Sequence, residues 1–124
     1  MVVGDSCEGE VVLYNNYVSF LGEVDPERGF LKTGMGEIDI AGKVLVMRGS
    51  RGSTVGSYIL YALARRGKSP KCIVVKEVEP ILVAGCVLGN TPLVIAEEYD
   101  KLVNDLSSGN FRRILWREGF IHAY

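Results

Sequence analysis

Histidine and cysteine are scarce in this sequence. One histidine, His122, is present among 124 residues, and a single histidine near a chain end is more often a surface residue than a base or metal ligand. The three cysteines, Cys7, Cys72 and Cys86, stand far apart and form no CxxC pair. We therefore expect no zinc or iron–sulfur site made from this chain alone, and we expect reduced, mostly buried thiols.

The sequence also lacks a basic surplus and a long apolar run. Lysine and arginine number 14 against 15 acidic residues, so the net charge is −1. That balance disfavours nucleic acid as a partner, because binding phosphate backbones needs excess positive charge. The sequence contains no run of about 18 apolar residues, the length that a membrane-spanning helix needs. Residues 1–5 do not resemble the start of a signal peptide. We expect a cytoplasmic protein without a membrane partner.

What the sequence does contain is enough apolar material for a core. Hydrophobic residues make up 48% of the chain, and a chain of this size buries roughly two-thirds of its unfolded surface. No repeat, low-complexity tract or linker divides the sequence. We expect a single domain over residues 1–124.

Short apolar segments alternate with helical patterns along the chain. Residues 9–21 predict a strand, a turn at the polar Asn15-Asn16 pair, and a second extended segment. Later segments predict strands over 30–32, 43–47, 72–75 and 92–95, and a hairpin over 111–121. They also predict a short helix that begins at the Glu79-Pro80 pair and ends between Gly85 and Gly89, and another over 99–106. Antiparallel strands followed by a β-α-β-α-β unit predict an α/β fold with a mixed sheet and short helices.

A Gly/Ser-rich segment, residues 48–57, follows the strand at 43–47. Beyond it the spacing of apolar residues predicts an amphipathic helix. Ser53 or Thr54 suits the N-cap, and Gly67 suits the position after the C-terminal end. The residues expected on one face of this helix are Val55, Tyr58, Ile59, Ala62, Leu63 and Arg66.

The loop before this helix is a candidate anion site. Backbone N–H groups at a helix N-terminus are unpaired, and the helix dipole adds positive charge there. Glycines let a ligand approach the backbone, while Arg48 and Arg51 suit carboxylate or phosphate groups. The segment over residues 51–54 is therefore predicted to bind an anionic substrate. The plainer alternative is a glycine-rich connection that only caps the helix.

Known nucleotide and hydrolase motifs do not fit this loop. It lacks the Gly-Lys-Ser/Thr ending of a P-loop, and its glycines are not spaced as GxGxxG. It is not a GxSxG nucleophile elbow, and no His–Asp pair is evident to activate a serine.

Four ordered segments of the chain form a distinctive pattern. The first is GKVLV over 42–46 followed by GSRGSTVGSY over 49–58. The others are VSFLGEVDPERG over 18–29, EPILVAG over 79–85, and NTPLV over 90–94. Together these segments resemble the aconitase X swivel domain family, in which isoleucine is usual at the position of Thr91. The resemblance covers roughly residues 8–124 and implies the swivelling β/β/α domain of the aconitase superfamily.

The resemblance also implies an activity and a partner. Free-standing chains of this length in the family look like small subunits of a heteromeric hydro-lyase. The implied reaction dehydrates (R)-5-phosphomevalonate to trans-anhydromevalonate 5-phosphate in an archaeal mevalonate route to isoprenoids. A separate large subunit is expected to carry a 4Fe–4S cluster, and this chain alone is expected to bind none and to be inactive.

The family's functional residues carry over onto the loop. By this resemblance Ser53 is the proton acceptor, held as an alkoxide, which the helix N-terminus and Arg51 would have to stabilise. Arg51 would also grip a substrate carboxylate. Gly52 and Thr54 would supply backbone contacts, and Ser50 and Ser57 are weaker substrate-binding candidates.

Two alternatives remain open at the level of sequence. One is the small subunit of a cis-3-hydroxy-L-proline dehydratase of the same family. The other is a non-catalytic anion-binding or assembly module, which would bind a ligand without any partner-dependent lyase activity. The aromatic and arginine-rich segment from Phe111 to Tyr124 is either a docking surface for the large subunit or the last hairpin of the core.

Overall fold

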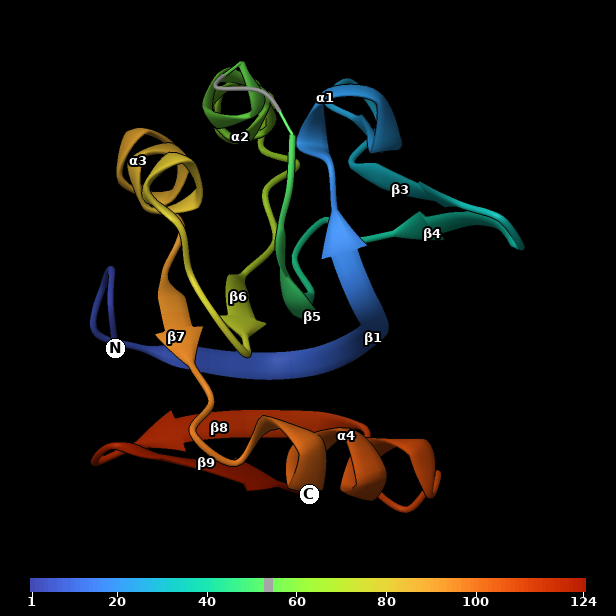
Figure 1. The fold of residues 1–124 in the computed structure, drawn as a ribbon, viewed down its shortest axis with the longest axis vertical. Helices are drawn as coiled ribbons and strands as arrows, with labels where there is room; N and C mark the ends of the chain where they lie inside the picture. The colour runs from blue at the N-terminus through green and yellow to red at the C-terminus, as the bar shows by residue number, and fades with distance from the viewer. Residues whose placement is uncertain (53–54) are drawn as a thin grey trace.

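The fold is built on a mixed six-stranded sheet. The computed structural model describes residues 1–52 and 55–124. The strands lie in the order β7-β6-β5-β1-β8-β9, as Figure 1 shows. Their bounds are β1 Cys7–Val18, β5 Val44–Ser50, β6 Cys72–Val75, β7 Leu93–Ile95, β8 Arg113–Arg117 and β9 Phe120–Ala123.

Strand β1 joins the two halves of this sheet. Its first residues pair antiparallel with β8, from Cys7 opposite Trp116. From Val11 onward it pairs parallel with β5, with Val11 opposite Val44. The strand curves between these partners (Figure 1), and it runs unbroken through the Asn15-Asn16 pair. The predicted turn there is wrong, because pairing with β5 resumes at Tyr17 after a register shift that absorbs the polar residues.

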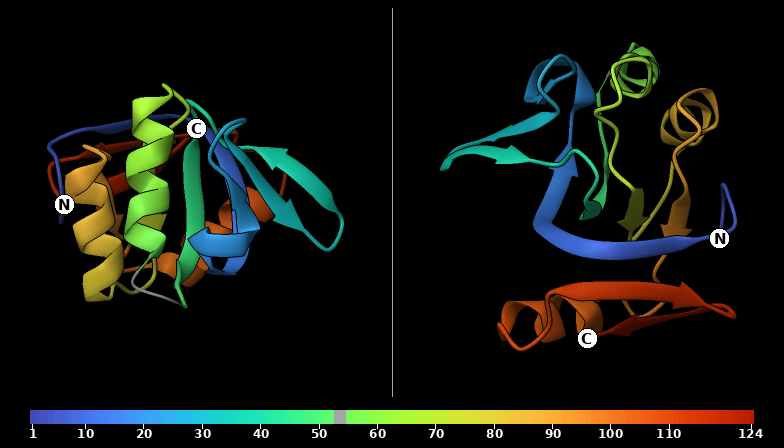
Figure 2. Two further views of the ribbon diagram at one scale, coloured as in Figure 1. Left: turned by 90° about the horizontal axis from the view of Figure 1, so that it is seen from above. Right: turned by 180° about the vertical axis from the view of Figure 1, so that it is seen from behind.

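The β-α-β-α-β unit predicted from the sequence is confirmed. β5, β6 and β7 are parallel neighbours. They are connected by α2 (Gly56–Arg65) and α3 (Pro80–Leu88). These two helices lie side by side on one face of the parallel strands β5, β6 and β7. On the opposite side of these strands lie α4 (Tyr99–Ser107) and, beyond the curve of β1, the β8–β9 end of the sheet (Figures 1 and 2). The α2 and α3 N-termini therefore lie at the same end of the molecule, beside the carboxyl ends of the parallel strands.

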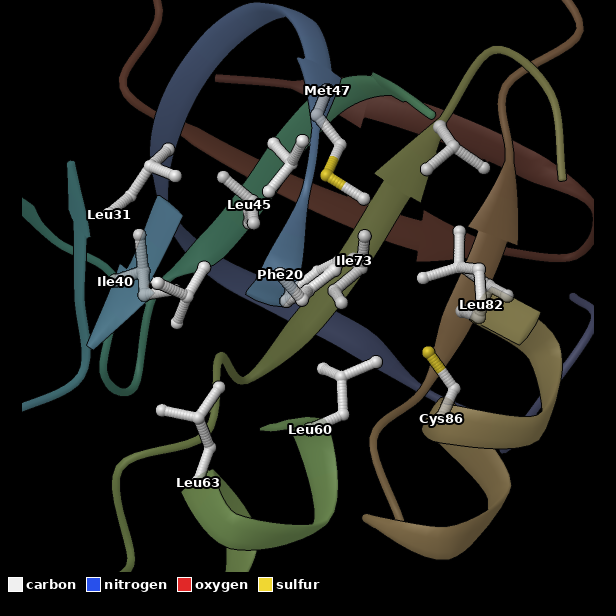
Figure 3. Packing of buried hydrophobic residues seen from close by; sticks show 14 residues of the cluster. Phe20, Leu31, Ile40, Leu45, Met47, Leu60, Leu63, Ile73, Leu82 and Cys86 are labelled. Carbon is white, nitrogen blue, oxygen red and sulfur yellow. The ribbon is translucent and has the colours of Figure 1, made fainter. Parts of the chain in front are cut away.

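Two layers of buried side chains hold the sheet between these elements. The odd-numbered residues Leu45 and Met47 of β5 pack toward α2 and α3, against Leu60 and Leu82 (Figure 3). The even-numbered Val44 and Val46 pack toward α4, against Tyr99. This alternation follows from the period of two along a strand, and it explains why β5 reads as an uninterrupted apolar run.

A small antiparallel sheet projects beside α1 (Phe20–Glu23). It contains β2 (Val24–Asp25), β3 (Phe30–Thr33) and β4 (Gly36–Asp39). Figure 2 shows it extending away from the main sheet. β3 was predicted, whereas β4 was missed because its Gly-Glu-Ile-Asp sequence is polar and mostly exposed. Ile40, immediately after β4, returns the chain to the core.

The helical face predicted for α2 has the wrong phase. The buried residues are Gly56, Ser57, Leu60 and Leu63, whereas Tyr58 is 64% exposed. Leu63 is shared by both patterns. The small residues near the start of α2 allow close packing, since Ser57 lies against Gly85 of α3 and a Cβ at Gly56 would face Phe20 of α1. That side of the helix is therefore buried even though it is not the most apolar. Within the described parts of the chain, no helix is both long and apolar enough to cross a bilayer.

Two cysteines are joined in a disulfide. Cys7 at the start of β1 is bonded to Cys72 at the start of β6, with their Cα atoms 5.6 Å apart. The expectation of reduced thiols is wrong for this pair and right for Cys86, which is free and buried. The sequence could not reveal the pairing, because it depends on β1 curving back across the foot of β6, 65 residues away along the chain.

Candidate functional site

The predicted loop lies at the carboxyl edge of the parallel strands. β5 continues to Ser50, three residues beyond the predicted end of this strand, and α2 begins at Gly56. Arg51 and Gly52 are described, whereas Ser53 and Thr54, the predicted base and its neighbour, lie outside the described residues. Ligands of open α/β sheets commonly bind at this edge, so the loop is well placed for a site.

Ser50 is connected to the start of the next helix. Its hydroxyl donates a hydrogen bond to Glu79 Oε1 over 2.5 Å. The same carboxylate accepts backbone N–H bonds from Ile81 at 2.8 Å and Leu82 at 2.7 Å. Glu79 is thus the N-cap of α3, directly before Pro80. This contact ties the end of β5 to the α3 N-terminus and fixes where the loop begins.

Arg51 is partly neutralised by an acidic neighbour. Its Nη2 lies 3.2 Å from Glu23 Oε1, and its side chain is 61% exposed. Glu23 Oε1 also accepts the Ser19 N–H over 2.6 Å. The Arg51 backbone N–H donates to the Val18 carbonyl over 3.0 Å. The backbone and one side-chain nitrogen are therefore held, while the exposed remainder of the guanidinium faces solvent.

Gly52 has a backbone conformation that favours glycine. Its φ is +105°, and an added Cβ would lie 3.0 Å from Ser19 Oγ. A side chain at this position would meet both backbone strain and a close polar contact. The glycine therefore lets the chain pass tightly over the turn at Ser19 just before it reaches Ser53.

The start of α2 differs from the prediction. The N-cap position is Val55, rather than Ser53 or Thr54, and its side chain makes no capping hydrogen bond. Ser57, a predicted substrate contact, is only 8% exposed, and its Cα lies 3.0 Å from where a Cβ of Gly85 would be. The structure thus places Ser57 against α3 rather than at the loop surface.

The recess beside the loop is small. Its volume is about 10 Å³, which is roughly the minimum needed to hold one water. A substrate at this loop must therefore lie over the surface, where a partner could enclose it. The lining residues are Phe20, Ser50, Arg51, Gly52, Gly56, Leu60, Glu79, Ile81 and Leu82.

A larger cavity of about 280 Å³ lies between α4 and β9 and shares no lining residue with this recess. Glu97, Glu98 and Asp105 line it against a single lysine, Lys101. This excess of carboxylates makes the cavity a poor place for an anionic substrate, because like charges repel.

The cysteines do not fit an iron–sulfur cluster. Two of them are bonded to each other, and the third is buried. Among the described residues, no group of three or more histidine, cysteine, aspartate or glutamate side chains could hold a metal ion. A cluster in a complex would need ligands from another chain.

A second polar cluster lies on the α4 side of the same sheet edge. The Arg48 guanidinium carbon is 6.0 Å from the ring centroids of both Tyr17 and Tyr99. The Tyr17 hydroxyl donates to Glu77, and the Tyr99 hydroxyl donates to Asn15 Oδ1 over 2.9 Å. From the sequence, Arg48 was predicted only to add positive charge near the loop. The aromatic partners were missed because they come from β1 and α4.

Similarity to known proteins agrees with this architecture. The family described as Aconitase X swivel domain matches residues 1–123. The chain is 47% identical over 116 residues to the phosphomevalonate dehydratase small subunit of Methanopyrus kandleri, which covers 91% of this chain and 85% of that one. It is also 47% identical to the protein of the same name from Pyrococcus abyssi, over 77% of this chain and 75% of the relative.

Two solved structures share the fold of this chain. The crystal structure of holo-form aconitase X from Thermococcus kodakaraensis superimposes with a TM-score of 0.82 at 35% identity, covering 99% of this chain and 93% of the other. A UPF0107 protein determined by solution NMR superimposes with a TM-score of 0.79 at 31% identity, covering 99% and 94%. The predicted swivel-type α/β fold is confirmed.

Proposed function

The chain belongs to the aconitase X swivel domain family, and from this membership we propose that it is the small subunit of a hydro-lyase that dehydrates (R)-5-phosphomevalonate. The product is trans-anhydromevalonate 5-phosphate, an intermediate of a mevalonate route to isoprenoids. The observation that carries the proposal is the 47% identity to the Methanopyrus kandleri phosphomevalonate dehydratase small subunit along 91% of the chain.

The activity requires a large subunit. The relatives are named as small subunits, and the recess at the loop is too small to enclose a substrate. We place the second half of the pocket, together with a 4Fe–4S cluster, on that partner, in a cytoplasmic heterodimer. The whole of residues 1–124 acts as the swivel-type domain of this complex.

Within this chain, Ser53 is the proposed base. Its Oγ, as the alkoxide, takes the proton from the carbon next to the substrate carboxylate and becomes a hydroxyl. The electrons of that C–H bond form the carbon–carbon double bond, and the substrate hydroxyl leaves the neighbouring carbon as hydroxide with the electrons of its C–O bond. A serine oxyanion needs strong stabilisation. The α2 N-terminus, which follows closely at Gly56, and the Arg51 guanidinium supply positive charge for that purpose.

The neighbours of Ser53 position the substrate. The exposed part of Arg51 grips the carboxylate through charge-assisted hydrogen bonds. Gly52 and Thr54 are the residues proposed to supply backbone contacts to the substrate. Ser50 contributes by holding Glu79, and thereby the shape of the recess, whereas Ser57 is buried and acts through packing.

The test is reconstitution with the large subunit under anaerobic conditions. We expect the complex to dehydrate 5-phosphomevalonate and Ser53→Ala to lower kcat by about 10²–10⁴-fold, the usual contribution of a positioned base, with assembly unchanged. Ser107→Ala, at the exposed end of α4, is the matched control.

Other outcomes separate the alternatives. Turnover of cis-3-hydroxy-L-proline in place of 5-phosphomevalonate would reassign the substrate. Ligand binding by the isolated chain, without lyase activity in the complex, would identify a non-catalytic module. A near-native kcat in Ser53→Ala would remove Ser53 from the role of base.

A further inference from the structure

Arg48 lies two residues before the end of β5 and is held firmly in place. Its backbone carbonyl accepts N–H bonds from Lys76 at 3.1 Å and Glu77 at 3.2 Å. Its side chain is half-buried on the face covered by α4, where the guanidinium lies near the rings of Tyr17 and Tyr99. The backbone of Arg48 is therefore held by the β6 end, and its guanidinium lies beside these two rings at the sheet edge that carries the loop.

The groups that contact this guanidinium are neutral. Nη1 donates to Asn15 Oδ1 over 3.4 Å, and the two rings offer only their electron-rich faces. Within residues 1–52 and 55–124, no carboxylate forms an ion pair with Arg48 within 4.0 Å. Partial burial of a positive charge costs free energy that an anion can offset, so a half-buried arginine with no carboxylate at ion-pair distance is suited to bind an anionic ligand.

The nearby acids have other partners. Glu77 accepts the Tyr17 hydroxyl, and Asp100 forms an ion pair with Lys76 over 3.6 Å. By contrast, Arg51 at the loop already has Glu23 as its counter-ion. Of these two arginines, Arg48 is the one that forms no ion pair with a carboxylate of the described residues.

Tyr99 and Asn15 pre-organise the cluster. Burial raises the pKa of Tyr99 to about 12, against an opposing effect of Arg48, so the phenol is protonated at neutral pH and donates to Asn15 Oδ1. That amide oxygen is thereby oriented to receive Arg48 Nη1 as well. Gly49 gives Tyr17 room, because a Cβ at Gly49 would lie 3.2 Å from the Tyr17 ring.

We propose that Arg48, positioned by Asn15, Tyr17 and Tyr99, binds the phosphate group of the substrate. This inference rests on the proposed function and deepens it by giving each charged end of the substrate its own arginine. Arg48 and Arg51 are three residues apart, a span of at most about 10 Å at about 3.3 Å per residue of extended backbone, which is on the scale of an extended five-carbon chain with a charged group at each end. The doubly charged phosphate binds to Arg48, which forms no ion pair within the described residues, and the carboxylate binds to Arg51.

The proposal is tested in the complex with the large subunit, using inorganic phosphate as a competitive probe. Arg48→Gln should raise both the KM for 5-phosphomevalonate and the Ki of phosphate by about 10- to 100-fold, the value of a charge-assisted hydrogen bond. Its kcat should stay within about 3-fold, because the phosphate does not react. Arg48→Lys should recover part of the loss, since lysine keeps the charge but not the two-pronged geometry.

Arg65→Gln is the matched control, because Arg65 is exposed in the last turn of α2, and it should leave both constants unchanged. Co-purification and thermal denaturation show whether each variant assembles and folds. An unchanged phosphate Ki in Arg48→Gln, or a collapse of kcat at constant Ki, would overturn the proposal.

Failure of the proposed function gives a different result. If the wild-type complex does not dehydrate 5-phosphomevalonate, titration calorimetry with inorganic phosphate still compares wild type with Arg48→Gln. Weaker binding in the variant supports a phosphate site at Arg48 for another phosphorylated substrate. Equal binding, or no binding by the wild type, rejects it.

Discussion

At the scale of single residues, Gly52 controls how the chain enters the loop. We expect Gly52→Ala to lower kcat/KM of the complex at least about 10-fold, because a positive φ and the contact with Ser19 force the backbone before Ser53 to move. The free energy of unfolding should fall by about 1–3 kcal/mol. Steady-state kinetics and urea denaturation measure the two effects.

Gly34 provides the control for this substitution. It lies in the β3–β4 turn, and an added Cβ would meet no atom within 4 Å. Gly34→Ala should leave kcat/KM unchanged. If Gly52→Ala behaved like this control, the tight path over Ser19 would have no part in shaping the site.

The residue types of the site could be predicted, but their partners could not. Ser50, Arg51 and Gly52 follow a recognisable strand and precede a recognisable helix, so a loop with hydroxyl and cationic groups was foreseeable. Glu23 and Glu79, which hold Arg51 and Ser50, lie 28 and 29 residues away in sequence. Such pairings depend on how elements pack, although the Glu-Pro pair at Glu79 does signal a helix start.

At the scale of elements, the contact between α2 and α3 depends on Gly85. A Cβ there would lie 2.6 Å from Leu60 Cδ1 and 3.0 Å from the Ser57 Cα. Gly85→Val should therefore separate the helices and lower the free energy of unfolding by about 1–3 kcal/mol. Urea denaturation followed by circular dichroism measures the loss.

Val87→Ala on the same helix is the control, since Val87 is 62% exposed and its truncation should change stability by less than about 0.5 kcal/mol. Because α2 carries the loop at its N-terminus, Gly85→Val should also lower the activity of the complex. Native stability in Gly85→Val would mean that the two helices can separate without cost.

The local pattern of apolar and polar residues identified most helices and strands of this fold. It failed where packing between elements determines the secondary structure or the buried face. The strands at β5, β6 and β7 are apolar runs, which any buried parallel strand requires. β4 is polar, so its identity comes only from pairing with β3. The buried face of α2 was misassigned because glycine and serine are buried there for their small size, and hydrophobic periodicity gives such positions little weight.

At the scale of the whole molecule, the disulfide joins the first strand to the middle of the chain. We expect alkylation after unfolding to label one thiol without reductant and three after reduction. In the folded protein Cys86 should stay unlabelled at pH 8, because it is buried and desolvation raises its pKa to about 12, so that little reactive thiolate forms.

The same bond should contribute to stability. Closing a loop across 65 residues contributes about 4 kcal/mol in the chain-entropy description. Replacing both Cys7 and Cys72 by alanine should lower the free energy of unfolding by about that amount, whereas the reductant should not alter the stability of this double variant. Three labelled thiols in the absence of reductant would contradict the pairing.

The central position of β1 has a consequence for how the protein is made. This strand is synthesised before both of its neighbours in the sheet, β5 and β8, and its pairing with β8 places Cys7 opposite Trp116. During translation the edge of β1 that pairs with β8 therefore stays open until β8 has left the ribosome. Unpaired strand edges invite association with other chains, so we expect this edge of β1 to be the part of the nascent main sheet that is exposed to aggregation until the β8–β9 hairpin pairs with it.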